Sequence, residues 1–134
     1  MQILGIHHVT LICADLERTA AFYRDVLGLA LLREATNDDD PGARHHWFST
    51  TIGGEAGTLL SFLEYPQMPQ GTQGTGATHH VALAVASAEE VEAWRDYLRS
   101  RNVPTTDALD RGGLRSLYIR DPDGHIIEIV AAAA

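Results

Sequence analysis

The stretch GIHHVTLICADLERTAAFYRDVLGL, residues 5–29, decides how this chain begins to fold. Its apolar, β-branched opening predicts a strand over residues 3–13. Asp15 stands where a helix N-cap belongs, and apolar residues then follow near helical spacing as far as Leu27. Gly28 suits the residue that ends a helix. The stretch therefore predicts a strand that leads directly into a helix.

The same order returns 72 residues further along the chain. ATHHVAL, residues 77–83, repeats the His-His pair of GIHHVTL, residues 5–11, within a strand predicted over 78–86. Ser87 and Glu90 form an S-x-x-E capping box before the second helix. Three more strands are predicted after each helix: 29–35, 44–51 and 57–64 in the first copy, then 104–109, 114–120 and 125–130 in the second. The turn DPDG, residues 121–124, separates the last two, and the chain reads βαβββ twice.

This repeat predicts an α+β fold built from two βαβββ modules. The modules span about residues 1–64 and 78–134, and the segment 65–77 between them is rich in Pro, Gly, Gln and Thr. A module of about 65 residues buries too little surface to be comfortably stable alone. We therefore interpret residues 1–134 as a single domain.

The composition is that of an ordinary soluble globular protein, with 45% hydrophobic and 21% charged residues. No run approaches the ~20 apolar residues of a membrane span, and no leader segment is recognisable at the N-terminus. The net charge of −8 argues against nucleic acid and anionic membranes as partners. Cys13, the only cysteine, excludes an internal disulfide and favours a cytoplasmic location.

Two histidines and one glutamate predict a metal centre. Side chains alternate along a strand, so His8 presents the same face as Thr10, and His80 presents the corresponding face of the second copy. Glu128 lies among isoleucines in the last predicted strand, where a buried carboxylate is costly unless it is paired or bound to metal. Two imidazoles and one carboxylate form the facial triad typical of non-haem Fe(II) enzymes. His8, His80 and Glu128 are therefore the predicted ligands.

Other interpretations of these residues stay open. Glu128 could pair with an arginine instead of a metal. His45 and His46 have no counterpart in the second module, and we favour a strand or cavity-rim role for them. Ser61 is the counterpart of Glu128 in the first module, which leaves one triad per chain.

Several motifs together resemble the vicinal oxygen chelate superfamily: HHVTL, DLERTAAFYRDVLGL, THHVALAV and DPDGHIIEI. That superfamily includes glyoxalase I, fosfomycin-resistance transferases, bleomycin-binding proteins and extradiol dioxygenases. LREATNDDDPGARHHWF and GGEAGTLLSF are further similar to dioxygenases that open hydroquinone rings. The resemblance implies cupped mixed sheets with helices outside, the metal triad above, and five supporting residues: His7, Thr10, His79, Arg111 and Tyr118. Strand alternation points His7 and His79 away from the metal, so their role requires a twist or bulge.

The resemblance implies cleavage of a hydroquinone- or catechol-like phenol with O2. Fe(II) is the favoured ion, and Mn(II), Zn(II) and Ni(II) fit the same ligands. Tyr118 and a neighbouring histidine are candidates for proton transfer, and Arg111 for stabilising a phenolate. Hydroquinone-cleaving proteins are usually longer chains, so we expect a homodimer in which His8 of one subunit joins His80 and Glu128 of the other.

Three alternatives use the same fold. A glyoxalase-like isomerase or a thiol transferase would hold metal with the same triad, and a bleomycin-type protein would only bind a drug. Ser61, in place of a fourth ligand, disfavours glyoxalase chemistry, and the lack of a basic cluster disfavours a fosfomycin-type transferase. The presence of all three ligands disfavours the drug-binding alternative.

Overall fold

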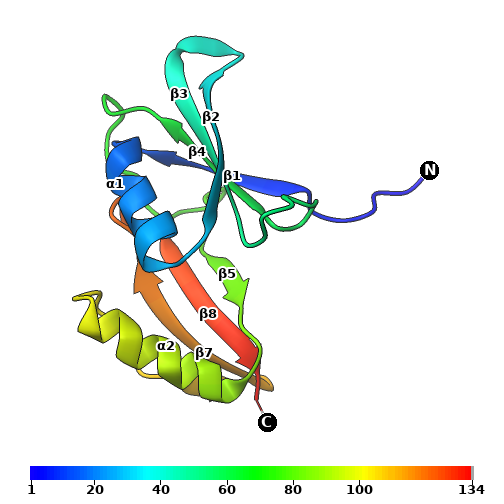
Figure 1. Ribbon diagram of the computed structural model, residues 1–134, viewed down its shortest axis with the longest axis vertical. Coiled ribbons are helices and arrows are strands. Elements are labelled where there is room, and N and C mark those ends of the chain that lie inside the picture. Colours follow the sequence, from blue (N-terminus) through cyan, green and yellow to red (C-terminus); the bar gives the residue numbers. More distant parts are fainter. Residues whose placement is uncertain (134) are drawn as a thin grey trace. The chain divides into compact units, whose positions relative to one another are not determined.

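The computed structural model describes residues 1–133, and the chain divides into two compact units, one over residues 1–69 and one from Gln70 onward. Each unit holds one four-stranded sheet and its helical segment (Figure 1). The predicted α+β repeat is confirmed. The division falls inside the segment predicted to join the two modules, and the interpretation of the whole chain as one domain stays a prediction.

The first unit follows the predicted order of elements. They are β1 (His8–Cys13), α1 (Leu16–Ala20), η1 (Ala21–Val26), β2 (Ala30–Asn37), β3 (Asp40–Ser49) and β4 (Leu59–Glu64). The strand order is β1-β4-β3-β2, with β1 parallel to β4 and the other neighbours antiparallel. Asp15 caps α1 by accepting bonds from the backbone of Glu17 and Arg18, and Gly28 adopts a φ of 79° just after the helical segment. Both caps are therefore as predicted.

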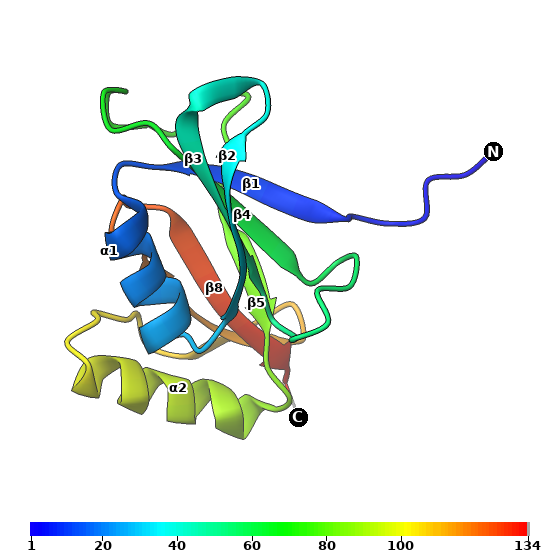
Figure 2. The same cartoon turned by 45° about the horizontal axis from the view of Figure 1, so that its top comes forward.

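Several features of the first unit differ from the prediction. β2 ends at Asn37 and β3 begins at Asp40, so both strands run further into the hairpin than the predicted 29–35 and 44–51. β1 begins only at His8, and residues 1–7 lead away from it (Figure 2). The helix changes to π geometry at η1, where the Leu27 N–H bonds the carbonyl of Phe22 five residues back. The apolar spacing in this stretch fits the 3.6-residue period of an α-helix, so it does not indicate the wider turn of a π-helix.

The second unit repeats the topology. Its elements are β5 (Val81–Ala84), α2 (Ala88–Ser100), β6 (Leu109–Arg111), β7 (Leu114–Arg120) and β8 (Ile126–Ala132). The strand order is β5-β8-β7-β6, with β5 parallel to β8. Ser87 accepts the N–H of Glu90, while the Glu90 carboxylate accepts the N–H of Ala86. The capping box is therefore formed, with the glutamate reaching one residue further back than predicted.

β5 and β6 are shorter than predicted. Residues 104–108 do not form part of β6, because Pro104 has no N–H and the Thr106 side chain takes part in the pairing instead. The Thr106 N–H bonds the Tyr118 carbonyl, and the Tyr118 N–H bonds Thr106 Oγ1. This segment thus flanks β7 beyond the end of β6.

The DPDG turn between β7 and β8 forms as predicted. Asp121 Oδ1 accepts the backbone N–H groups of Asp123 and His125, each at 2.9 Å, and Gly124 adopts a φ of 92°. The turn therefore fixes the residue at which β8 begins.

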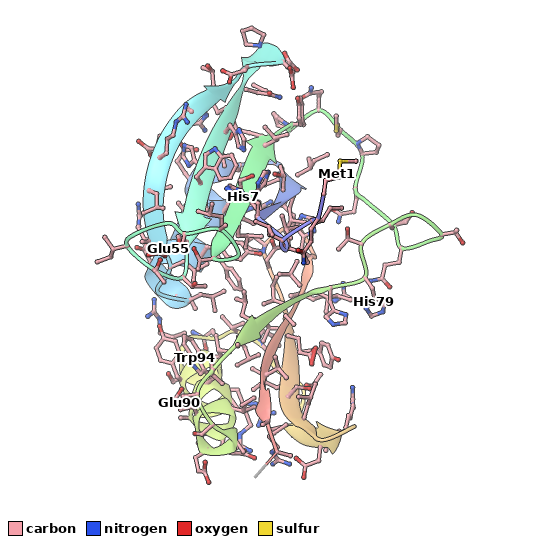
Figure 3. All side chains as sticks on the ribbon, turned by 90° about the vertical axis from the view of Figure 1, so that its right-hand side faces the viewer. Met1, His7, Glu55, His79, Glu90 and Trp94 are labelled. Atoms are coloured by element: carbon pink, nitrogen blue, oxygen red, sulfur yellow. The ribbon has the colours of Figure 1, made fainter. Side chains whose placement is uncertain are left out.

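Each sheet has one face covered by helix. In the first unit the rings of Tyr23, Phe48 and Phe62 are fully buried against one another. In the second unit, α2 covers β7 and β8 along the face that carries Leu117 and Ile127. Figure 3 shows α2, with Glu90 and Trp94, on one side of this sheet and His79 on the other. Residues that alternate with the buried ones therefore face the side of His79.

Candidate metal and substrate site

His80 and Glu128 come together in the second unit. Glu128 lies in the middle of β8, between Ala82 of β5 and Tyr118 of β7, and is only 8% exposed. Its Oε2 lies 3.1 Å from Nε2 of His80. Two donors each bound about 2.1 Å from one ion, at a right angle, lie about 3.0 Å apart. The observed 3.1 Å fits two ligands of one ion, and it equally fits a direct hydrogen bond between the imidazole and the carboxylate.

The arginine alternative for Glu128 finds no support within residues 1–133, where no arginine contacts its carboxylate. The buried carboxylate has His80 as its partner.

His79 fixes the ring of His80. The two Nδ1 atoms lie 2.8 Å apart, so one ring donates to the other. When Nδ1 of His80 is the donor, Nε2 keeps the lone pair that a metal requires, and it is Nε2 that faces Glu128. The expected conflict with strand alternation is absent, because both histidines precede β5, which starts at Val81. No twist or bulge is needed.

The first unit repeats this arrangement without a carboxylate. Nδ1 of His7 lies 3.0 Å from Nδ1 of His8, and the His8 ring lies 4.7 Å from the ring of Trp47. Thr10 Oγ1 and Ser61 Oγ are 2.6 Å apart and form a hydrogen bond. The contribution of His8 to a site with His80 and Glu128 stays a prediction.

Tyr118 and Arg111 extend the cluster in the second unit. The Tyr118 ring stands edge-on to His80, with centroids 5.6 Å apart, and the Arg111 guanidinium carbon lies 5.5 Å from the centre of the Tyr118 ring. The second contact has the geometry of a cation–π pair. His79, His80, Arg111, Tyr118 and Glu128, predicted from separate parts of the sequence, thus form one cluster.

A cavity of about 610 Å³ lies beside this cluster, within the size range of small-molecule sites. His79, Arg111 and Tyr118 line it, as do Thr106, Arg120 and Ile126, which the sequence analysis did not identify. A signal for Arg120 was available, since it lies two residues after Tyr118 and shares its strand face.

An acidic group in the first unit is an ion-pair cluster. Carboxylate oxygens of Asp15, Glu17 and Glu64 lie within 4.8 Å of one another. Arg44 bonds both Glu17 and Glu64 at 2.8 Å, and this bonding lowers the pKa of Glu17 to about 2. Asp15 is already engaged as the N-cap of α1. The arginine therefore supplies the positive charge that a metal would otherwise bring.

The third histidine pair lies on β3, in agreement with the favoured strand role. His46 is 6% exposed and burial lowers its pKa. The His45 ring packs 4.9 Å from the ring of Trp47. Neither belongs to the cluster of the second unit.

Comparison with known proteins places this fold in a family. The Glyoxalase/Bleomycin resistance protein/Dioxygenase superfamily matches residues 5–129, so the chain belongs to that superfamily, as the motifs indicated. "Putative ring-cleaving dioxygenase MhqO" of Bacillus subtilis (strain 168) is 35% identical over 127 residues, covering 95% of this chain and 40% of that protein. A crystal structure of a "putative dioxygenase" from Bacillus subtilis superposes with a TM-score of 0.87 at 34% identity, covering 97% of this chain and 41% of that one.

A lactoylglutathione lyase of Salmonella typhimurium is 31% identical over 126 residues, covering 93% of this chain and 90% of that protein. The chain thus spans about two fifths of the dioxygenase-named relatives but nearly all of this lyase. A search of the described helices finds none long and apolar enough to cross a membrane.

Proposed function

We propose that this chain forms a metal-dependent, extradiol-type ring-cleaving dioxygenase acting on a hydroquinone or catechol-like phenol with O2. The observation that carries the proposal is the 3.1 Å approach of His80 Nε2 to the buried Glu128 carboxylate beside a cavity that Tyr118 lines. The similarity to dioxygenase-named relatives, at 35% identity for one of them, gives the reaction class.

The donor set fits a divalent ion. One imidazole nitrogen and one carboxylate oxygen are in place, and a second imidazole completes a facial set that leaves positions for substrate and O2. Fe(II) is the ion we favour, while Mn(II), Zn(II) and Ni(II) suit the same donors. Such an ion, once bound, would act as a Lewis acid and electron conduit between phenol and O2.

The chain's own groups supply orientation and proton handling. Tyr118 lines the cavity, and its hydroxyl can hold or move a proton at a phenol oxygen, an effect typically worth ~10²–10⁴-fold in rate. His79 keeps the His80 ring oriented through the Nδ1 contact. Arg111, stacked on Tyr118, offers a fixed positive charge to a phenolate.

We propose that His8 reaches the site from a second subunit, with His7 and Thr10 supporting it as His79 supports His80. The chain covers 40% of one dioxygenase-named relative. Because its own first unit has a histidine pair but no carboxylate at the Ser61 position, we propose that two copies share the ligands in a homodimer. A cytoplasmic location is part of the proposal and rests on the single cysteine.

Oxygen uptake tests the reaction. Protein reconstituted with Fe(II) under anaerobic conditions should consume O2 and form a yellow ring-opened product when hydroquinone and air are added. Glu128→Gln should abolish uptake, while Glu89→Gln, on the exposed first turn of α2, should not change it. Iron-loaded protein that consumes no O2 with any member of a phenol panel would contradict the proposal.

Mixed dimers test the shared ligands. His8→Ala and Glu128→Ala chains should each be inactive alone. A mixed dimer would regain one intact site if His8 meets the Glu128 of the other subunit, and activity should return to about half of the parent's. If all ligands come from one chain, no mixture recovers activity.

A lactoylglutathione lyase is the second candidate, because that relative matches over 90% of its own length. Against it, Ser61 is uncharged and bonded to Thr10 where a fourth ligand would stand. Formation of lactoylglutathione without O2, by Ni(II)- or Zn(II)-loaded protein, would favour this candidate over the dioxygenase.

A further inference from the structure

The cavity of the second unit carries positive charge in an acidic chain. The chain has a net charge of −8, yet Arg111 and Arg120 both line this cavity. Over residues 1–133, no carboxylate contacts either guanidinium. Arg115, between them on β7 but on the other face, is bonded to both Glu92 and Asp110. Carboxylates thus neutralise Arg115, which lies outside the cavity. The positive charges of Arg111 and Arg120 remain available to a ligand in the cavity.

Both arginines are held in place beside Tyr118. The Arg111 guanidinium lies over the Tyr118 ring, which orients its plane and leaves its edge free to donate hydrogen bonds. Arg120 shares the strand face of Tyr118, and its NH1 donates to the Gly124 carbonyl at 2.9 Å. One contact anchors each side chain, and most of the five N–H donors of each guanidinium remain for a ligand.

The remaining walls suit an aromatic ring. Ile126, which pairs with Arg120 across β7 and β8, and Pro104 provide apolar surface. The Glu128 carboxylate is directed to His80. The cavity therefore combines an apolar seat with two cations at a point away from the predicted ligands.

We infer that the cavity selects a phenol that carries a carboxylate on its ring, bound by Arg120, while Arg111 stays beside the phenolate oxygen. This inference rests on the proposed function, and it names the substrate class of that site. A guanidinium presents paired donors in a plane that match the two oxygens of a carboxylate, whereas a neutral substituent would leave the donors unpaired. The phenol hydroxyls would then face His80 and Glu128.

Anaerobic calorimetry tests the inference, using protein both as purified and loaded with Fe(II). The probes are gentisate, which is a hydroquinone with one ring carboxylate, and its carboxamide of nearly equal size. Gentisate should bind about tenfold more tightly than the carboxamide. Arg120→Gln should remove that preference and leave carboxamide binding unchanged, while Arg120→Lys should retain part of it.

Arg101→Gln is the matched control, because Arg101 contacts Tyr97 at the end of α2 and does not line the cavity. It should keep the full preference for gentisate. Equal binding of the two probes would overturn the inference, as would a preference that survives in Arg120→Gln. A circular dichroism melt of each variant confirms folding, and Arg120→Lys decides the case if Arg120→Gln does not fold.

The two proposals fail in different measurements. Oxygen uptake with plain hydroquinone reports on the dioxygenase and needs no ring carboxylate. Selective gentisate binding without any oxygen uptake would remove the dioxygenase and leave an anion-selective cavity. Oxygen uptake with no preference for gentisate would do the opposite.

Discussion

Ser61 in the first unit and Glu128 in the second occupy the same point of one architecture. Ser61 of β4 lies between Thr10 of β1 and Trp47 of β3, and its hydroxyl bonds Thr10 at 2.6 Å. Glu128 of β8 lies between Ala82 of β5 and Tyr118 of β7, and its carboxylate contacts His80 at 3.1 Å. At the same register, one unit thus makes a neutral hydrogen bond, and the other brings a carboxylate to a histidine.

Around this point the two units agree. Each has a His-His pair joined through Nδ1 atoms, at 3.0 Å in the first and 2.8 Å in the second. Each places an aromatic ring of the third strand against the second histidine: Trp47 on His8 and Tyr118 on His80. The repeat thus orients a histidine in each unit, while the chemistry proposed for the second unit depends on a few positions where the copies differ.

The largest expected difference separates Glu128→Ala from Ser61→Ala. Loss of a ligand should lower metal affinity by more than about a hundredfold, since even residues supporting a ligand are worth ~10–100-fold. Ser61→Ala should keep its metal and lose about 1 kcal/mol of unfolding free energy with the Thr10 bond. Metal content by mass spectrometry and urea denaturation measure both. Equal metal loss in the two variants would break the comparison.

The second-largest difference is expected in kcat, between variants of the aromatic residues Tyr118 and Trp47. Tyr118→Phe removes only a hydroxyl and should lower kcat about 10²-fold at unchanged metal content. Trp47→Phe removes no ionisable group and should lower kcat much less. Steady-state oxygen uptake at saturating phenol distinguishes them. A tyrosine variant with parental kcat would assign Tyr118 to packing alone.

His7 and His79, the first histidine of each pair, should have similar effects on metal binding in the two units. His79→Ala and His7→Ala should each weaken metal binding by about 10–100-fold, because the ligand histidine loses the contact that fixes its ring. Competition with a chelator of known affinity measures the change. A loss confined to His79→Ala would show that only the second pair orients a ligand.

The smallest effect is expected for the ion pairs that Arg44 makes with Glu17 and Glu64. Bonding to Arg44 lowers the pKa of Glu17 from 4.5 to about 2, and also lowers the pKa of Glu64. Because these pKa values are depressed in the folded state, the stabilisation is complete above pH 4.5 and is lost as the pH falls toward 2.

Arg44→Gln should therefore lower Tm by only a few degrees at neutral pH, and the difference should vanish at acid pH. Arg115, which lowers the pKa of Glu92 in the second unit, offers the matching variant Arg115→Gln. Calorimetric melts across this pH range measure both. A difference in Tm that grows at acid pH would contradict the assignment.

The sequence alone predicts features that depend on residues close together along the chain. Asp15 and Ser87 cap their helices through backbone groups at most three residues away. The face of Glu128 follows from strand alternation, since Ile127 and Ile129 on either side are buried.

Local sequence patterns do not predict features that depend on which strands pair and where the pairing begins. The contact between His79 and His80 depends on where β5 starts, which its pairing with β8 decides. The strand face of Arg120 follows from alternation with Tyr118, but the cavity that it lines also depends on residues 104–106, which flank β7. Both are consequences of tertiary structure, to which local sequence patterns are blind.

The DPDG turn has an evolutionary consequence. Asp121 fixes the start of β8 by accepting two backbone N–H groups, and Glu128 follows at a set count of residues. A single inserted or deleted codon between this turn and Glu128 would move the carboxylate to the face that α2 covers. The hairpin at Gly112 and Gly113 lies at the opposite end of β7, where length can vary without changing that parity. A change of length at the Gly112–Gly113 hairpin would therefore leave Glu128 on its face and shift Arg111, which pairs with Leu114. A change of length at the DPDG end would displace Glu128 itself.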